Sequence, residues 1–411
     1  MTGSAITSVA TPLADSTLDA IVAGVAAWGL PVALGLGVVF ALQAAILGFV
    51  NLSRYRRAAA DVAPTASTSV TVCIPARNEE ANIEACVRSV LANAGPLAIE
   101  VLCYDDQSTD ATPTMLAKLV AEDERVRVAQ TVPLPPGWNG KQHACWRLAN
   151  EARGAWLLFT DADVRFEPDA LRRSVGEAER LGVALLSTVP RQIVGSLSEA
   201  LAVPMIHVLL LSYLPIGRMR STLDTSASAG CGQFLLARAD AYRATGGHSS
   251  FRESMHDGIR MPRLFRAAGF RTDLFDGTDL VSVRMYRGLA QTWRGFAKNA
   301  FEGLGSVALL VMLTIMHGLG HVLPWAFLAW SLVTARPADT LTGLAAAAVV
   351  LAIVERWMLA VRFEQPRFIA FLHPFAMVMM TAIQWHSLWL ALRGRRSWKG
   401  RTAAASPTPA L

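Results

Sequence analysis

The segment WLLFTDADVRF, residues 156–166, carries the pattern that decides the fold. Four large apolar residues, Trp156 to Phe159, predict a buried strand, and two carboxylates, Asp161 and Asp163, follow directly after it. In open α/β sheets, ligands bind at the carboxyl ends of the strands. Two carboxylates one residue apart can present oxygens to one hard cation such as Mg²⁺ or Mn²⁺. The segment therefore predicts a cation site at the edge of a sheet.

The sequence upstream of this segment repeats the order of strand, polar loop and helix. The predicted strands are SVTVCIP (69–75), IEVLCYDD (99–106) and RVRVAQ (125–130). Helical patterns follow them at 79–94, 111–123 and 141–154. This alternation predicts βαβ units and an α/β domain with a Rossmann-like, mainly parallel sheet.

The composition indicates membrane spans beside this domain. Of the 411 residues, 53% are hydrophobic and 17% are charged, and the mean hydropathy is +0.35. Residues Ile21–Val50 exceed the about 20 residues that a helix needs to cross a bilayer. Because no basic residue precedes them and no clear cleavage site follows, we expect a retained anchor. Arg54, Arg56 and Arg57 place the flank after it on the cytoplasmic side.

Three later apolar blocks are each long enough to span: Ser306–Ala335, Leu341–Val361 and Phe368–Leu392. If each crossed once, the basic stretch at 393–401 would finish outside, against the positive-inside rule. We therefore expect one block not to cross, and favour Ser306–Ala335. Gly318, Gly320 and Pro324 interrupt it, and a re-entrant element is tolerated where it lines a protein-walled cavity.

We therefore expect a multi-pass protein of the cytoplasmic (inner) membrane whose α/β domain lies in the cytoplasm. The expected segments are a polar N-terminal tail (1–17), a transmembrane anchor (18–50), a basic juxtamembrane linker (51–68), the α/β domain (69–280), interfacial helices (281–305), transmembrane or re-entrant helices (306–392) and a basic cytoplasmic tail (393–411).

The charge and the cysteines argue against two other classes of protein: those that bind nucleic acid and those built on disulfides or a CxxC motif. The net charge is +6, but many basic residues lie beside the apolar spans, where attraction to anionic lipid accounts for them. We therefore expect no nucleic-acid partner. The five cysteines show neither paired spacing nor a CxxC, which indicates reduced thiols in the core.

Three more polar signatures follow predicted strands or open helices. PARNEE (75–80) and DDQSTD (105–110) are each also compatible with a helix cap or turn. The adjacent carboxylates Asp105 and Asp106 repel each other unless a ligand there needs several acceptors. PLPPGWNGKQHA (133–144) brings Lys141 to a helix start, where a phosphate can bind. It lacks the spacing of a P-loop.

Together, these signatures resemble the GT-A catalytic domain of family 2 glycosyltransferases, over roughly residues 69–305. Members of that family use nucleotide-diphosphate sugars as donors. The resemblance implies that Pro75, Glu79 and the Asp105/Asp106 pair hold the nucleoside. It also implies that Asp161 and Asp163 hold Mg²⁺ or Mn²⁺ and the diphosphate.

The same resemblance assigns the acceptor side of the site. MHDG supplies Asp257 as the catalytic base, although the family usually shows Glu-Asp where this chain has His256-Asp257. We expect His256 to form a hydrogen bond near the site. QTWRGF resembles the Gln-x-x-Arg-Trp motif of processive synthases, with Gly295 in place of Trp, and suggests acceptor or diphosphate contacts for Gln291 and Arg294. An interfacial helix explains this stretch equally well.

The closer resemblance, through PLPPGWNGK, FTDADV, RMYRGLAQTWRGFAKN and SWKGR, is to hopanoid-associated, carotenoid and ceramide-type lipid glycosyltransferases. It implies an inverting enzyme that transfers a sugar from a nucleotide-diphosphate sugar, with uridine favoured, to a hydroxyl of a lipid acceptor. Two alternatives stay open. One is a processive polysaccharide synthase, and the other is a non-catalytic transporter or flippase with a nucleotide-sugar-binding domain. A nucleotidyltransferase is disfavoured because IPARNEE contains no glycine.

Overall fold

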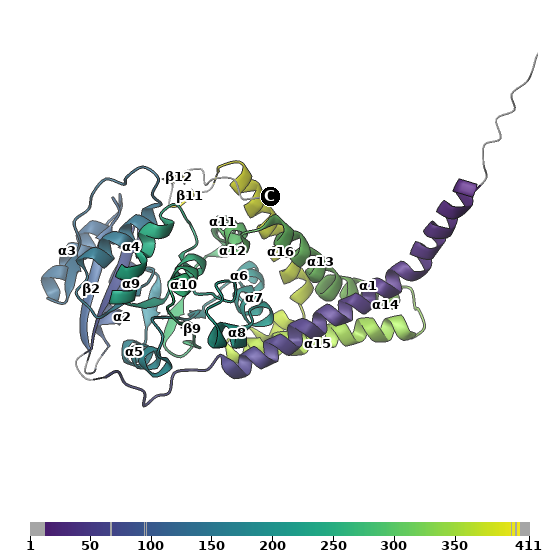
Figure 1. Cartoon of the computed structure of the whole chain (residues 1–411), viewed down its shortest axis with the longest axis horizontal. Helices are drawn as coiled ribbons and strands as arrows, with labels where there is room; N and C mark the ends of the chain where they lie inside the picture. The colour runs from purple at the N-terminus through teal and green to yellow at the C-terminus, as the bar shows by residue number, and fades with distance from the viewer. Residues whose placement is uncertain are drawn as a thin grey trace, which may run out of the picture.

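The computed structural model describes residues 13–65, 68–93, 95, 97–395, 397–398 and 401–402. The α/β domain lies at one end of a group of long helices, and the N-terminal helix extends away from it (Figure 1). The first residues of the expected N-terminal tail and most of the last ones of the basic tail fall outside the described part.

A seven-stranded sheet forms the centre of the α/β domain, in the order β3-β2-β1-β4-β8-β6-β9. Its strands are β1 (Ser69–Ala76), β2 (Ala98–Asp105), β3 (Val126–Val128), β4 (Trp156–Phe159), β6 (Leu185–Ser187), β8 (Leu235–Arg238) and β9 (Thr272–Leu274). β1 to β4 are mutually parallel, and β8 is antiparallel to both of its neighbours. The expected mainly parallel sheet is confirmed, with β3 shorter than its sequence pattern.

A second sheet of three strands and a set of short helices complete the domain. The strands are β5 (Val164–Phe166), β7 (Arg191–Gln192) and β10 (Val281–Val283), with β10 in the middle. The helices are α2 (Ile83–Leu91), α3 (Thr112–Glu122), α4 (Gly140–Glu151), α5 (Ala170–Leu181), α9 (Ala239–Thr245), η1 (Gly247–Phe251) and α10 (Asp257–Ala267). The alternating strand side chains feed two apolar cores, one shared with α2, α3 and α5 and the other with α4, α9 and α10.

The remaining helices form the apolar part of the chain. They are α1 (Leu13–Arg54), α6 (Leu197–Ala202), α7 (Met205–Tyr213), α8 (Ile216–Ser221), α11 (Gly288–Ala297), α12 (Ala300–Leu304), α13 (Val307–His317), the π-helix η2 (Gly318–Val322), α14 (Leu323–Val333), α15 (Thr340–Arg362), η3 (Arg367–Ala370) and α16 (His373–Leu392); β11 (Ser397–Trp398) and β12 (Arg401–Thr402) follow. Within the described residues, four helices are long and apolar enough to cross a membrane: Trp28–Arg54, Val307–Val333, Thr340–Arg362 and His373–Leu392.

Residues 307–333 do not turn back, contrary to the expectation for this block. The helix is interrupted by the π-helix η2, but it continues along α1 in the opposite direction. Gly37 of α1 lies so close to η2 that a Cβ there would be 2.4 Å from the carbonyl oxygen of Leu319. Farther out, Leu34 packs with Phe327 of α14 and Ala345 of α15. The segment therefore runs away from the α/β domain, and α15 returns towards it.

The element that starts and finishes near the α/β domain is instead η3 with α16. After α15, Phe363 stacks on His207, beside the end of α1. α16 then begins next to η2, where His373 Nε2 lies 3.1 Å from His321 Nδ1. It returns along α13, and the indole of Trp385 donates to Thr314 Oγ1 at 2.9 Å. α16 therefore begins at the level of η2 and runs back along α13.

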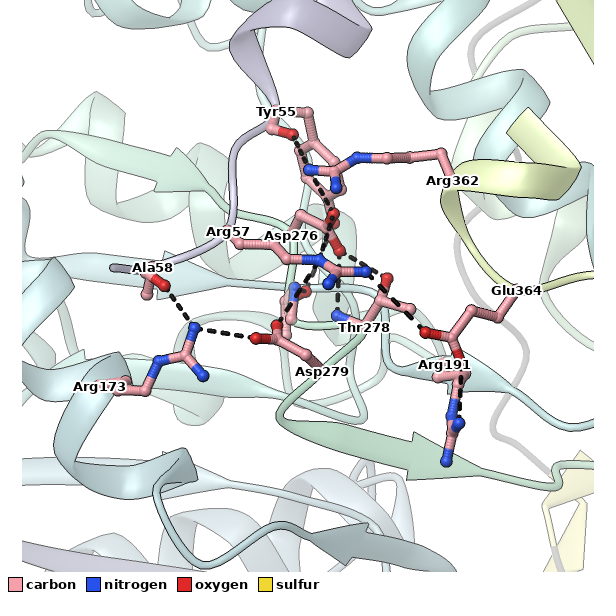
Figure 2. Close-up of polar contacts among 12 residues, drawn as sticks. Tyr55, Arg57, Ala58, Arg173, Arg191, Asp276, Thr278, Asp279, Arg362 and Glu364 are labelled. Carbon is pink, nitrogen blue, oxygen red and sulfur yellow. Dashed lines mark hydrogen bonds and ion pairs between the residues drawn. The ribbon is translucent and has the colours of Figure 1, made fainter. Parts of the chain in front are cut away.

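An ion-pair network joins the ends of α1 and α15 to the α/β domain (Figure 2). Its centre is Asp276, which is fully buried in the loop between β9 and β10. The Asp276 carboxylate lies 2.7 Å from Arg362 Nη2 and 3.6 Å from Arg57 Nε. Its other oxygen accepts from the amide and hydroxyl of Thr278. Because all these groups meet at one carboxylate, the network fixes the domain against the long helices.

Asp276→Ala is expected to lower the free energy of unfolding by about 1–3 kcal/mol, because it removes a buried acceptor from Thr278 and from two partly exposed guanidinium groups. Thermal unfolding of the purified protein in detergent measures this loss. Asp240→Ala is the control, since the pair of Asp240 with Arg238 is exposed and is worth less than about 1 kcal/mol. Equal melting temperatures for the two variants would contradict the prediction.

Candidate active site

The polar signatures meet at the carboxyl edge of the parallel strands. β1 and β2 are in register, with Ala76 opposite Asp105, and β4 ends just before the Asp161-Asp163 segment. A cavity of about 990 Å³ opens at this edge. Of the residues expected at the site, those on its wall are Pro75, Glu79, Lys141, Asp161, Asp163, His256, Asp257 and Gln291.

Three of the expected residues do not line this cavity. Asp105 accepts from the amide of Ser108 with Oδ1, and Asp106 is buried with one oxygen 3.9 Å from Arg77 Nη1. The exposed Arg294 donates from Nε to the carbonyl of Ala290 in its own helix. Each of the three side chains thus has a contact near its own position in the chain or with Arg77. Their roles towards the donor or the acceptor stay predictions.

Asp163 has the environment of a cation ligand. Its Oδ1 is buried and has no hydrogen-bond partner among the described residues. Burial and the neighbouring Asp161 and Glu79 raise the pKa of Asp163 to about 7, because each disfavours another negative charge. A divalent cation would relieve that repulsion.

The described residues fit a cation that is completed by its substrate. No group of three His, Cys, Asp or Glu side chains in this part of the chain is placed to hold a metal by itself. Mg²⁺ is commonly held by one or two carboxylates together with substrate phosphates. Asp163 and Asp161 would supply the protein ligands, and the phosphate oxygens of a bound nucleotide would supply the rest.

Lys141 links the expected cation site to the expected base. Its Nζ lies 2.7 Å from Asp161 Oδ1 and 3.0 Å from Asp257 Oδ2. Asn139 caps α4 by accepting from the Lys141 amide, which fixes where the side chain starts. Burial alone would lower the pKa of Lys141, but the two carboxylates outweigh it and raise the pKa well above its usual value. The ammonium is therefore permanently charged beside both acids.

Asp257 opens α10 and points into the same cavity. Its Oδ1 accepts from the amide of Gly258 at 2.8 Å. Gly232 makes room for this carboxylate, since a Cβ there would lie 2.1 Å from Oδ1. Burial raises the pKa of Asp257, but the ammonium of Lys141 outweighs burial and holds the pKa below its usual value. The carboxylate is thus ionised at neutral pH and can accept a proton.

The hydrogen bond expected of the His256 side chain stays a prediction. Its ring lies against α12, where a Cβ on Gly303 would be 3.1 Å from Nε2. Burial lowers the pKa of His256, although Asp257 and Glu302 favour the charged form. The imidazole therefore enters the site as a neutral group.

Glu302 of α12 is a functional candidate that has no motif in the sequence. Its carboxylate accepts from Ser254 Oγ and, at 3.2 Å, from the amide of Met255. These two residues directly precede His256 and Asp257. A helix beside the apolar part of the chain thus holds the loop that carries the expected base.

The far part of the cavity is apolar and lies among the long helices. Its wall is formed by α7, α13 and α16, through Ile206, Leu209, Leu210, Leu309, Met312, Leu313, Met316 and Met380. One cavity therefore connects a cluster of charged groups with an apolar space among the helices.

Comparisons with known proteins agree with this geometry. Residues 71–246 match the sequence profile of Glycosyl transferase family 2. The 4,4'-diaponeurosporenoate glycosyltransferase of Staphylococcus aureus is 28% identical over 256 residues, which cover 60% of this chain and 65% of that protein. The matched region thus spans slightly less than two thirds of the curated relative.

The solved structure of the mannosyltransferase PcManGT from Pyrobaculum calidifontis, in complex with GDP-Man and Mn²⁺, has a similar architecture. The TM-score is 0.55 at 18% identity, with 87% of this chain and 99% of that chain covered. At this identity the likeness establishes the fold. The expected GT-A fold is confirmed.

Proposed function

We propose that this chain, whose residues 71–246 form a family 2 glycosyltransferase domain with the GT-A fold, is a membrane-bound inverting glycosyltransferase. It transfers a sugar from a nucleotide-diphosphate sugar, with uridine favoured, to a hydroxyl of a lipid. The observation that carries this proposal is the single cavity that joins Asp161, Asp163 and Asp257 to an apolar space among long helices. The relative named as a 4,4'-diaponeurosporenoate glycosyltransferase supports the same class of reaction.

The donor lies at the charged end of the cavity. Pro75 and Glu79 line the part next to β1 and would contact the nucleoside. The family resemblance assigns Asp105 and Asp106 to the nucleoside, and Asp106 lies 3.9 Å from Arg77, which lines the cavity. Asp161 and Asp163 would hold Mg²⁺ or Mn²⁺, which when bound neutralises charge on the diphosphate. The ammonium of Lys141 adds a second positive charge at the same place.

The chemical step is a single displacement. The acceptor oxygen forms a bond to the anomeric carbon while the bond from that carbon to the diphosphate oxygen breaks. Asp257 accepts the hydroxyl proton, and the electron pair of the broken bond leaves with the nucleoside diphosphate. Gln291 lines the cavity and would meet the acceptor or the diphosphate. The role of Arg294 stays a prediction, since its side chain lies outside the wall.

The test is to incubate membranes that contain the protein with a panel of labelled nucleotide sugars and Mg²⁺ or Mn²⁺. Extracted lipids that carry the label support the proposal, and the lipid and sugar that carry it identify both substrates. A labelled polymer without labelled lipid would favour a polysaccharide synthase. Label that crosses the membrane without any covalent product would favour a transporter.

We also propose that the α/β domain faces the cytoplasm and that α16 returns to that side. Ala338, between α14 and α15, would then lie outside, and Ala403 inside. In a variant without the native cysteines, Ala338→Cys is expected to react with a membrane-impermeant reagent in intact cells, whereas Ala403→Cys reacts only after permeabilisation. Labelling of Ala403→Cys in intact cells would show that the last block crosses the membrane. Because both changes replace alanine, each variant is the control of the other.

A further inference from the structure

Lys298 lies in the short connection between α11 and α12, and it lines the cavity. Its environment differs from that of Arg294, one turn earlier, which is exposed and bonds its own helix. Lys298 is half-buried, and no carboxylate among the described residues forms an ion pair with it. Because an ammonium that is partly removed from water needs a counter-charge, its place on the wall indicates an anionic ligand.

The connection that carries Lys298 is held against the loop of the expected base. The side-chain amide of Asn299 donates to the carbonyl of Met255 at 3.4 Å. Glu302, in the helix that follows, accepts from the amide of Met255 at 3.2 Å. Met255 lies two residues before Asp257. These contacts therefore fix the backbone of Lys298 relative to the base.

Charges at the reactive end of the cavity act on the ammonium of Lys298. Burial lowers the pKa of Lys298, while Asp161, Asp257 and Asp163 oppose this effect by favouring the charged form. Because such interactions weaken with distance, these carboxylates and the ammonium share one end of the cavity. Lys141 already pairs with Asp161 and Asp257, at 2.7 and 3.0 Å. Lys298 is therefore a second ammonium at this end, and its hydrogen-bond donors remain for a ligand.

We propose that Lys298 is a catalytic residue that binds the terminal phosphate of the nucleoside diphosphate, the phosphate to which the sugar is bonded in the donor. The cation at Asp161 and Asp163 holds the diphosphate, and the sugar carbon lies within reach of the acceptor hydroxyl that gives its proton to Asp257. The sugar-bearing phosphate therefore lies between these two groups, and the charges of both act on Lys298. When the bond from the carbon to the phosphate oxygen breaks, the electron pair stays on that phosphate. The N–H groups of the ammonium stabilise the added charge by hydrogen bonds, without transferring a proton. This inference rests on the proposed function, because it takes the charged end of the cavity as the donor site.

The test measures the dissociation constants of UDP and of UMP, each with Mn²⁺, for the purified protein in detergent. UMP lacks the terminal phosphate, so the ratio of the two constants isolates the contribution of that group. Lys298→Met keeps the length of the side chain and removes its charge. This variant is expected to bind UDP about 10–100-fold more weakly, the range for a hydrogen bond to a charged group. Its binding of UMP is expected to stay unchanged, which also shows that the variant is folded.

Lys118→Met is the matched control, because Lys118 is exposed on α3 and pairs with Glu84 and Glu122 at the surface. It is expected to bind both nucleotides as the wild type does. A wild type that binds UDP no more tightly than UMP, an unchanged ratio in Lys298→Met, or an equal loss of both nucleotides would each overturn the inference. A ratio that falls in Arg294→Met but not in Lys298→Met would also overturn it, and would assign the contact to Arg294. Since no sugar transfer is measured, these outcomes leave the transferase proposal to be judged by lipid labelling.

Discussion

Asp257→Asn is expected to lower the rate of sugar transfer by about 10²–10⁴-fold, the usual contribution of a general base. The amide has the size of the carboxylate and keeps an oxygen for the amide of Gly258, but it does not accept a proton at neutral pH. It also leaves Asp161 and Asp163 in place. Binding of the nucleotide sugar should therefore persist while turnover is lost.

The measurement combines turnover with donor binding by the purified variant. Asp240→Asn is the control, because Asp240 is an exposed residue of α9 that pairs with Arg238 at the surface. Near-normal turnover by Asp257→Asn would remove the base assignment. Loss of donor binding together with turnover would mean instead that Asp257 acts through Lys141, 3.0 Å away, on the diphosphate end of the site.

Local patterns in the sequence were sufficient for the sheet and for most of the charged end of the site. Each strand of the parallel half is a short apolar run followed by polar residues, and parallel strands bring those residues to one edge. Asp161, Asp163, Lys141 and Asp257 accordingly meet in one cavity. Asp105 and Asp106 show the limit of this reasoning. The sequence predicts that they follow a strand, but it does not predict the contact of Asp105 with Ser108 or that of Asp106 with Arg77.

The contacts that complete the site are far apart in sequence, and no local pattern announces them. Glu302 bonds residues almost fifty positions earlier, and Lys298 reaches the cavity only through folding. A carboxylate in a short helix and a lysine between two helices are ordinary features of a sequence. Only the packing of α12 and the turn before it against the domain gives these side chains a place in the site.

The glycines of the block at residues 306–335 have a packing role in the structure. Gly320 was interpreted as a point where the helix turns back. In the structure it is a packing contact, because a Cβ there would lie 3.1 Å from that of Phe40 on α1. Small residues that let helices approach closely are common between membrane helices. Glycine alone does not distinguish close packing from a break.

Asp163→Ala is expected to reduce transfer by about 10³-fold or more and to weaken diphosphate binding at the same time. In the proposed mechanism the cation is the connection between the protein and the leaving group, and Asp163 is its most buried ligand. Removal of the divalent cation from the wild type with EDTA should cause the same loss of transfer and of diphosphate binding. Full activity in excess EDTA would contradict the assignment and favour a mechanism in which lysine side chains neutralise the diphosphate.

The melting temperature of Asp163→Ala shows whether its loss of activity comes from loss of the cation or from misfolding. Asp163 shares its surroundings with Asp161 and Glu79, and repulsion among the three disfavours the folded protein when no cation is bound. Asp163→Ala should therefore melt no lower than the wild type without metal, and should lose the rise in melting temperature that UDP and Mn²⁺ give the wild type. Asp169→Ala, a change at an exposed carboxylate near the start of α5, is expected to keep both the activity and that rise. If Asp163→Ala melts lower than the wild type without metal, Asp163 has a structural role. If the variant melts at the same or a higher temperature, the wild type keeps these carboxylates together at a cost in stability, as expected for a site that binds a cation.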